Sequence, residues 1–207
     1  MLCMIQYIQG VNKMIEAIIG TMKSEKTSTL IDTVNELQNK KVKVFYPSHC
    51  NKMDGYVYSR KDNKKLKGIK VFNISDLYNN INNVDTIFID EVQFIVSSNN
   101  VDEFMNFIEY CDTKNIDVYL VGLQLDYMNN SFDIIQRILP YTDKVTILTA
   151  KCEICGSDDA VRCIRYNGDE LDCDPNSSLI LLESDKIVYK SVCKKCYRKI
   201  TSLPAIK

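Results

Sequence analysis

Residues that could bind phosphate lie near the N-terminus, in the sequence GTMKSEKT. In a phosphate-binding loop of the pattern G-x-x-x-x-G-K-[ST], backbone N–H groups and a helix N-terminus hold phosphate oxygens. The lysine reaches the terminal phosphates and the hydroxyl binds Mg²⁺. Gly20, Lys26 and Thr27 fit this pattern, whereas Glu25 occupies the position of the second glycine. The segment predicts a degenerate phosphate loop; the alternative is an ordinary helix start capped by Ser24.

Two adjacent acids, Asp90 and Glu91, follow the largely apolar run 84–89. An acid at the end of a buried strand is where a phosphate-loop fold places the carboxylate on the Mg²⁺ side. Its neighbour could accept a proton from an attacking hydroxyl. The alternative is an acidic pair that only caps the next turn. Each element is a weak signal by itself, but together and in this order they favour a phosphotransferase.

Two C-x-x-C pairs, Cys152/Cys155 and Cys193/Cys196, lie in the last third of the chain. Four thiolates suit tetrahedral Zn²⁺, and a site without an open position is structural rather than catalytic. The alternative is a redox pair or four unrelated thiols. The other cysteines are expected to be small buried hydrophobes or surface thiols; they are Cys3, Cys50, Cys111, Cys163 and Cys173.

Strand-like and helix-like stretches must position these groups. Strands are expected at 16–19, 41–46, 84–90 and 118–121, and helices at about 27–39 and 101–111. This alternation predicts an α/β fold with a parallel sheet flanked by helices. From about residue 151 the pattern changes to short β-like runs around the cysteines, which predicts a small zinc-binding, β-rich unit. We expect a kinase-like domain at 1–150, with 1–13 as a possible extension, and a second domain at 151–207.

Composition restricts the class of protein. The chain has 207 residues, 45% of them hydrophobic, and a formal net charge of −1, so a sizeable core is expected and a duplex nucleic-acid partner is not. No apolar run approaches the roughly 20 residues of a membrane span, and the start makes a poor signal peptide, so a cytoplasmic location without a membrane partner is expected. Translation could start at Met14. Basic side chains cluster near the C-terminus and are expected to form a solvated face; they are Lys186, Lys190, Lys194, Lys195, Arg198 and Lys199.

The combination of motifs resembles a known family. The degenerate loop GTMKSEKT is followed by DEVQF at 90–94, GLQLDY at 122–127 and the two cysteine pairs, the second within YKSVCKKCY at 189–197. This set resembles the thymidine kinases found in animals, poxviruses, bacteria and phages, over nearly the whole chain. The resemblance implies transfer of the ATP γ-phosphoryl group to the 5′-hydroxyl of thymidine, with deoxyuridine as a second substrate.

The resemblance also implies roles for individual residues. Glu91 matches the general base and Asp90 the acid on the Mg²⁺ side. The phosphate and metal contacts would come from Gly20, Thr21, Met22, Lys23, Ser24, Lys26, Thr27, Asp90 and Gln93. The nucleoside pocket would be lined by Met22, Phe94, Leu123, Tyr127, Cys163, Arg165, Leu181, Leu182 and Tyr189. The cofactors would be Mg²⁺ with ATP and a structural Zn²⁺.

The family's small domain carries a lasso-like loop over the nucleoside, here about 168–189, which bonds the base with main-chain groups. Members are commonly homotetramers inhibited by the thymidine triphosphate end product. Tyr189 is the lasso side chain expected to contact the nucleoside.

The sequence departs from the family pattern at three points. Glu25 replaces a loop glycine, at a conformational cost of roughly 1–2 kcal/mol and with a repulsion of about 4 kcal/mol if its carboxylate lay about 4 Å from a phosphate. Cys50 and Lys52 stand where the family has an Asp-x-Arg pair, and Leu182-Glu183 or Glu183-Ser184 where the lasso has Gly-Gly. The alternative hypotheses are therefore a catalytically impaired, nucleotide-binding relative and, third, a zinc-ribbon module that binds nucleic acid.

Overall fold

A computed structural model describes residues 14–49, 54–174, 177–178, 181 and 184–201. Its centre is a six-stranded sheet in the order β5-β2-β6-β7-β1-β8. All the strand pairs of this sheet are parallel, which confirms the predicted α/β class. The strands are β1 (Ile15–Gly20), β2 (Val42–Pro47), β5 (Ile69–Val71), β6 (Thr86–Ile89), β7 (Asp117–Leu123) and β8 (Lys144–Leu148).

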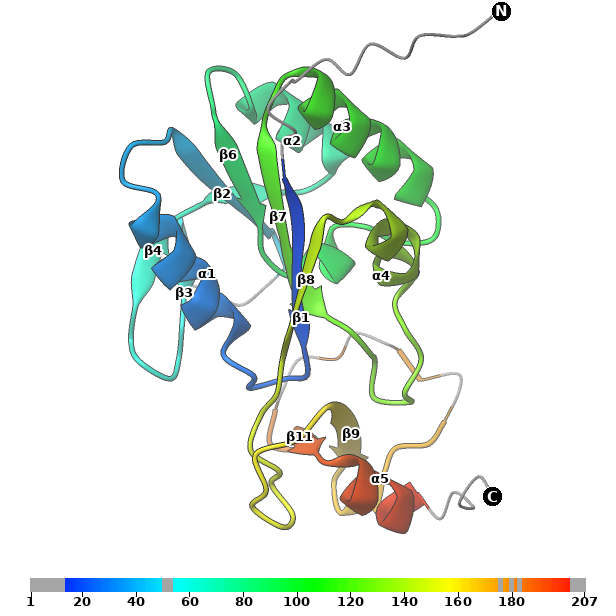
Figure 1. Cartoon of the computed structure of the whole chain (residues 1–207). Helices are drawn as coiled ribbons and strands as arrows, with labels where there is room; N and C mark the ends of the chain where they lie inside the picture. Colours follow the sequence, from blue (N-terminus) through cyan, green and yellow to red (C-terminus); the bar gives the residue numbers. More distant parts are fainter. Residues whose placement is uncertain (1–13, 50–53, 175–176, 179–180, 182–183, 202–207) are drawn as a thin grey trace, which may run out of the picture.

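Helices cover both faces of this sheet (Figure 1). On one face lie α1 (Lys26–Glu36) and a hairpin of β3 (Tyr56–Tyr58) and β4 (Lys65–Lys67). On the other lie α2 (Ile74–Asn80), α3 (Val101–Thr113) and α4 (Asp133–Ile138). Each face buries its own apolar core, as expected for a parallel sheet whose crossover helices lie on both sides.

The elements predicted from periodicity exist, with ends shifted by a few residues. Of the strands and α-helices described so far, β3, β4, β5, β8, α2 and α4 were not predicted. They are short, and α2 has a signal of its own. Asn73 caps its first turn and Asp76 bonds back to the Asn73 N–H, which together form a capping box.

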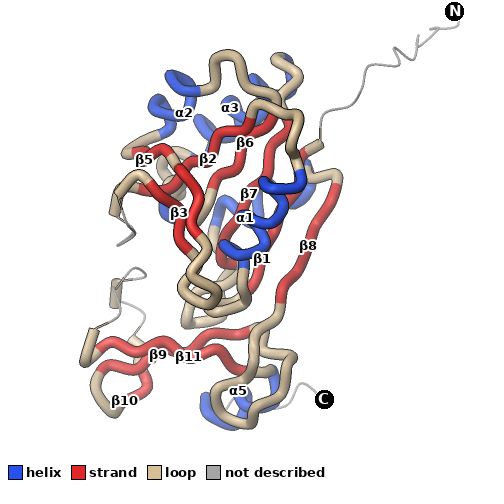
Figure 2. Tube along the Cα trace, turned by 90° about the vertical axis from the view of Figure 1, so that its left-hand side faces the viewer, coloured by secondary structure: helices blue, strands red, loops and turns tan. Residues whose placement is uncertain are grey.

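The C-terminal part forms a separate small sheet beneath the C-terminal ends of the large-sheet strands (Figure 2). Its strand order is β10-β9-β11, with β9 (Arg162–Asn167), β10 (Glu170–Leu171) and β11 (Ile187–Val192) all antiparallel. Helix α5 (Lys194–Thr201) follows directly, and its Cys196 and Tyr197 pack with β9 and β11 in a third core. Strand β9 begins eleven residues after position 151, where the sequence pattern was predicted to change, and the division into two domains stays a prediction.

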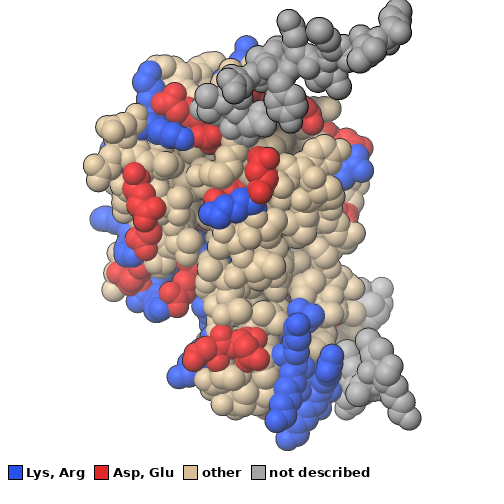
Figure 3. All heavy atoms as spheres, in the orientation of Figure 1, with Lys and Arg blue, Asp and Glu red and all other residues tan. Residues whose placement is uncertain are grey.

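Two further features of the described residues concern membrane-spanning helices and surface charge. Among the described residues, no helix is both long and apolar enough to cross a membrane. Basic side chains gather over α5 at one end of the molecule (Figure 3). Lys194, Lys195, Arg198 and Lys199 are all exposed there, as the charge pattern predicted.

Candidate active site and metal centre

The phosphate-loop segment connects β1 to α1 in a tight turn. A side chain at position 20 would clash, because a Cβ there would lie 2.4 Å from the Ser24 Oγ and 2.6 Å from the Leu148 carbonyl oxygen. Within the turn, the Lys26 Nζ donates to the Thr21 carbonyl at 2.7 Å, and the Ser24 Oγ donates to the same oxygen at 2.8 Å. Ser24 therefore folds back onto the loop, and the alternative of Ser24 as the helix cap is wrong.

Glu25 is the residue at which α1 begins, and it has a left-handed backbone conformation with φ 65°. This is the conformation that the missing glycine would adopt without strain, and it costs a non-glycine residue roughly 1–2 kcal/mol. Lys23 has a similar φ of 59°. The turn thus has a left-handed backbone at two positions, Lys23 and Glu25, where a side chain makes this conformation unfavourable.

The strand-end acids lie next to this loop. Asp90 is 1% exposed, and its Oδ2 is 3.4 Å from the Thr27 Oγ1. Its Oδ1 accepts the Glu91 N–H at 3.0 Å. Glu91 itself has φ 52°, a strained conformation that turns the chain sharply as it leaves β6. The two motifs predicted separately from the sequence therefore meet at one edge of the sheet.

Gln93 holds the neighbouring strand close to these acids. Its Nε2 donates to the Glu91 Oε2 at 2.8 Å, and its Oε1 accepts the Leu123 N–H at 3.0 Å. The close approach of the Gln93 side chain to β7 requires a glycine at position 122, because a Cβ there would lie 2.4 Å from the Gln93 Oε1. The glutamine thus positions the Glu91 carboxylate relative to the end of β7.

An apolar cluster separate from the two large cores lies at the same end of the sheet. Tyr127, Cys163 and Tyr189 are buried in it, with Met22 of the loop packed against them. Four residues predicted for the base pocket thus come together from four distant segments. Phe94 lies apart from this cluster: it is half-buried, with its ring edge-on to His49 at a centroid distance of 5.5 Å.

Arg165 is fully buried behind the two tyrosines. Its guanidinium carbon is 3.5 Å from the Tyr127 ring centroid, and its Nε and Nη2 bond to the Asp172 carboxylate. Its remaining donors reach the Ser178 carbonyl, the Tyr189 hydroxyl and the Ser177 hydroxyl. Burial raises the pKa of Tyr127, so this phenol stays protonated and donates to the Asp174 carbonyl at 3.1 Å. The arginine fixes the orientation of both rings.

The phosphate loop also rests on the small sheet. The Thr21 hydroxyl donates to the Arg162 carbonyl at 3.0 Å, and the Ser191 hydroxyl donates to the Met22 carbonyl. The Lys23 Nζ donates to the Tyr189 carbonyl at 3.2 Å. These bonds join the loop to β9 and β11, so the loop lies directly beside the strands that carry Cys163 and Tyr189 of the apolar cluster.

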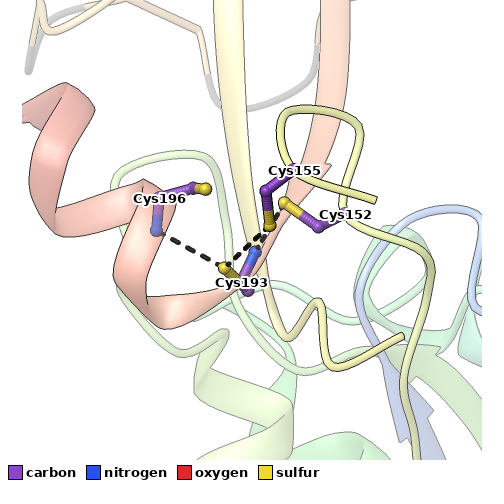
Figure 4. Close-up of side chains that lie close together, drawn as sticks. All are labelled: Cys152, Cys155, Cys193 and Cys196. Atoms are coloured by element: carbon purple, nitrogen blue, oxygen red, sulfur yellow. Dashed lines mark hydrogen bonds between the residues drawn. The ribbon is translucent and has the colours of Figure 1, made fainter. Parts of the chain in front are cut away.

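The four cysteines of the two C-x-x-C pairs meet in space (Figure 4). Their sulfur atoms all lie within 4.8 Å of one another, and those of Cys155 and Cys193 are 3.8 Å apart. Thiolates around a tetrahedral Zn²⁺, each about 2.3 Å from the ion, are about 3.8 Å apart. The Cys152 Sγ accepts the Cys193 N–H and the Cys193 Sγ accepts the Cys196 N–H, and such N–H···S bonds orient thiolates and stabilise their charge. The donor set therefore fits a metal such as zinc.

Comparison with known proteins agrees with this geometry. A protein-family model described as thymidine kinase matches residues 13–197. The chain belongs to the thymidine kinase family. It is similar to the thymidine kinase of Amsacta moorei entomopoxvirus, with 29% identity over 88% of this chain and 97% of the relative. It is also similar to the thymidine kinase of Pseudothermotoga lettingae, with 26% identity over 89% of this chain and 95% of the relative.

Several other residues that the resemblance to thymidine kinases singled out lie outside the apolar cluster, and some of them lie outside the described residues. Leu123 stands at the end of β7, where its N–H meets Gln93. The Leu181 carbonyl accepts the Tyr189 hydroxyl at 3.1 Å. Leu182, Glu183, Cys50 and Lys52 fall outside the described residues, as does most of the run 179–182 that was expected to be β-like.

Three charged residues that contact the candidate site of this thymidine kinase family member were not predicted from the sequence. Glu153 bonds to the phosphate loop, Asp172 neutralises Arg165, and Lys61 meets Glu25. Of the three, only Glu153 could have been found from the sequence. It lies between Cys152 and Cys155, so it is held near the segments that this C-x-x-C pair contacts. The other two partners are brought close by tertiary folding.

Proposed function

We propose that the protein is a thymidine kinase that transfers the γ-phosphoryl group of ATP to the 5′-hydroxyl of thymidine, giving dTMP, and that accepts deoxyuridine as a second substrate. The observation that carries the proposal is the 3.4 Å contact between the Thr27 hydroxyl and Asp90. It brings a phosphate loop and a pair of strand-end acids into one site, the arrangement that phosphoryl transfer from a Mg²⁺-bound nucleotide requires. Membership of the family and the names of the two relatives support the same reaction.

In this proposal the loop binds the triphosphate. The backbone N–H groups of 20–27 and the start of α1 surround its oxygens, and Lys26 leaves the Thr21 carbonyl to reach the terminal phosphates. Thr27 and Asp90 would hold Mg²⁺, which supplies neutralisation of phosphate charge when it is bound. The oxygen donors of these two residues suit that hard cation.

Glu91 is the proposed general base. It takes the proton of the 5′-hydroxyl while the hydroxyl oxygen forms a bond to the γ-phosphorus, and the bond from that phosphorus to the bridging oxygen of ADP breaks. Its carboxylate is already held by the Gln93 amide at 2.8 Å. We propose that Gln93 keeps the carboxylate pointed at the hydroxyl, so that the reacting groups are oriented before the transfer.

The nucleoside base would bind against the apolar cluster of Met22, Tyr127, Cys163 and Tyr189, with Phe94 as a ring on its other side. An apolar pocket with few fixed polar groups is the usual site for a flat heterocycle. Since all five Arg165 donors are used by protein groups, we propose that this residue orients Tyr127 and Tyr189 rather than touching the nucleoside. Zn²⁺ on the four cysteines would hold the two ends of the lasso together.

An impaired, nucleotide-binding relative is the second candidate, and Glu25 is the observation that favours it. The decisive experiment is conversion of thymidine to its monophosphate by the purified protein with Mg-ATP, repeated with a Glu25→Gly variant. Turnover by the natural chain supports the proposed function. Turnover by the glycine variant alone supports the impaired relative, and inactivity of both refutes the proposal.

A further inference from the structure

The carboxylate of Glu25 is bonded to a residue outside the phosphate loop. Its Oε1 bonds to the Lys61 Nζ, which belongs to the turn between β3 and β4. The backbone of the same residue serves α1, because its carbonyl accepts the Thr29 N–H at 2.9 Å. The side chain is 47% exposed, so packing constrains it little and the bond to Lys61 sets its direction.

The turn that carries Lys61 is anchored without help from Glu25. The Ser28 hydroxyl, on the first turn of α1, donates to the Asp62 carboxylate at 2.5 Å. Lys64 pairs with Asp32 of α1 at 2.7 Å and with Asp62 at 3.0 Å. Hydrogen bonds from Ser28 and then Ser59 hold the pKa of Asp62 well below its usual range, so this anchor keeps its charge at neutral pH. The buried Val57 of β3 packs in the core beneath α1.

These contacts place the Lys61 ammonium group beside Glu25, the one loop residue whose negative charge would repel the phosphates of a nucleotide. A carboxylate turned toward the bound triphosphate would repel it strongly at short range. A carboxylate paired with a lysine contributes almost no net charge. Because the pair is exposed, it adds little to folding stability, and its effect should appear in nucleotide affinity.

We propose that Lys61 is a positioning residue for the nucleotide site: it holds the Glu25 carboxylate outside the phosphate loop, so that the loop accepts ATP although its second glycine is missing. The inference rests on the proposed function only in taking ATP as the ligand of this loop. It explains how a loop with an acid at a glycine position can remain a phosphate site, and it makes the β3–β4 turn part of that site.

The test is the affinity for a non-hydrolysable Mg-ATP analogue, measured by titration calorimetry on the whole protein at low salt. Lys61→Met should weaken binding about two- to fivefold, the range expected for losing one exposed ion pair. Lys61→Arg should keep the affinity, because it can form the same pair. Lys67→Met is the matched control: it removes an exposed lysine from the same hairpin and should leave the affinity unchanged.

The double variant makes the test specific. In a Glu25→Gly background there is no carboxylate to hold, so Lys61→Met should have no further effect. An equal loss in both backgrounds would overturn the inference, because Lys61 would then act on the nucleotide itself. Unchanged binding by Lys61→Met would also overturn it, even if the natural chain phosphorylates thymidine. Failure of the natural chain to bind the analogue would refute the inference together with the proposed function.

Discussion

Glu153, which stands between the first two candidate metal ligands, binds the phosphate loop directly. Its Oε1 accepts a hydrogen bond from the Lys23 Nζ at 2.7 Å, and its Oε2 accepts the Ser191 N–H at 2.6 Å. The Glu153 N–H in turn donates to the Ser191 carbonyl at 2.9 Å. A single side chain thus joins the first C-x-x-C pair, strand β11 and the loop at which the triphosphate is proposed to bind.

We expect Glu153→Ala to lower the free energy of unfolding by about 1–3 kcal/mol, because it leaves the buried Ser191 N–H without its acceptor. Lys23→Met removes the half-exposed ion pair with Glu153 and the hydrogen bond to the Tyr189 carbonyl but leaves the Ser191 N–H bonded, and it should cost about 1 kcal/mol or less. Urea unfolding of both variants measures the difference. Equal losses would mean that the ion pair, and not the bond to the buried N–H, carries the stabilisation.

Removal of one candidate metal ligand should unfold the small sheet locally. Cys193→Ser is expected to lower bound zinc to well under one ion per chain and to increase amide exchange in β11 and α5, since structural zinc contributes directly to folding. Metal analysis and hydrogen exchange measure these effects. Cys173→Ser, which changes an exposed thiol, is the control and should keep the metal. A full zinc content in Cys193→Ser would exclude this residue as a ligand.

Glu91→Gln should lower the rate of phosphoryl transfer much more than it weakens thymidine binding. The amide keeps the size of the side chain but cannot accept the hydroxyl proton, so kcat should fall by about 10²- to 10⁴-fold while thymidine affinity changes little. Steady-state kinetics and equilibrium binding provide the two quantities. Glu109→Gln, an exposed change on α3, is the control. Undiminished turnover in Glu91→Gln would refute the assignment of the base.

Phe94→Ala tests the placement of the nucleoside base. We expect thymidine binding to weaken by on the order of 1 kcal/mol or more, as for the loss of an aromatic contact, and nucleotide binding to stay within about twofold. Separate titrations with thymidine and with the ATP analogue make the comparison. Tyr141→Ala, on the exposed segment η2 (Leu139–Tyr141), serves as the control. A similar loss for both ligands would count against stacking by Phe94.

Much of the fold could be predicted because its signals are local. The helical spacing of α1 and α3, the apolar runs of β1, β6 and β7, and the order of these elements all lie in short windows of sequence. The short elements were harder. Seven residues suffice for α2 because tertiary packing buries Ile74 and Leu77, and such packing overrides the weak intrinsic preference of a short segment.

The sequence by itself determined which groups are available for chemistry: a lysine and a threonine after a glycine, two acids at the end of a strand, and two cysteine pairs at metal-binding spacing. It could do so because each motif is a run of a few residues whose spacing reflects one local geometry. Only the tertiary structure decided what surrounds those groups. Glu25 meets Lys61 across 36 positions and Lys23 meets Glu153 across 130, and Arg165 contacts Tyr127 and Tyr189, which come from distant segments. Charges this far apart in the chain leave no trace in local spacing, because only folding brings them within bonding distance.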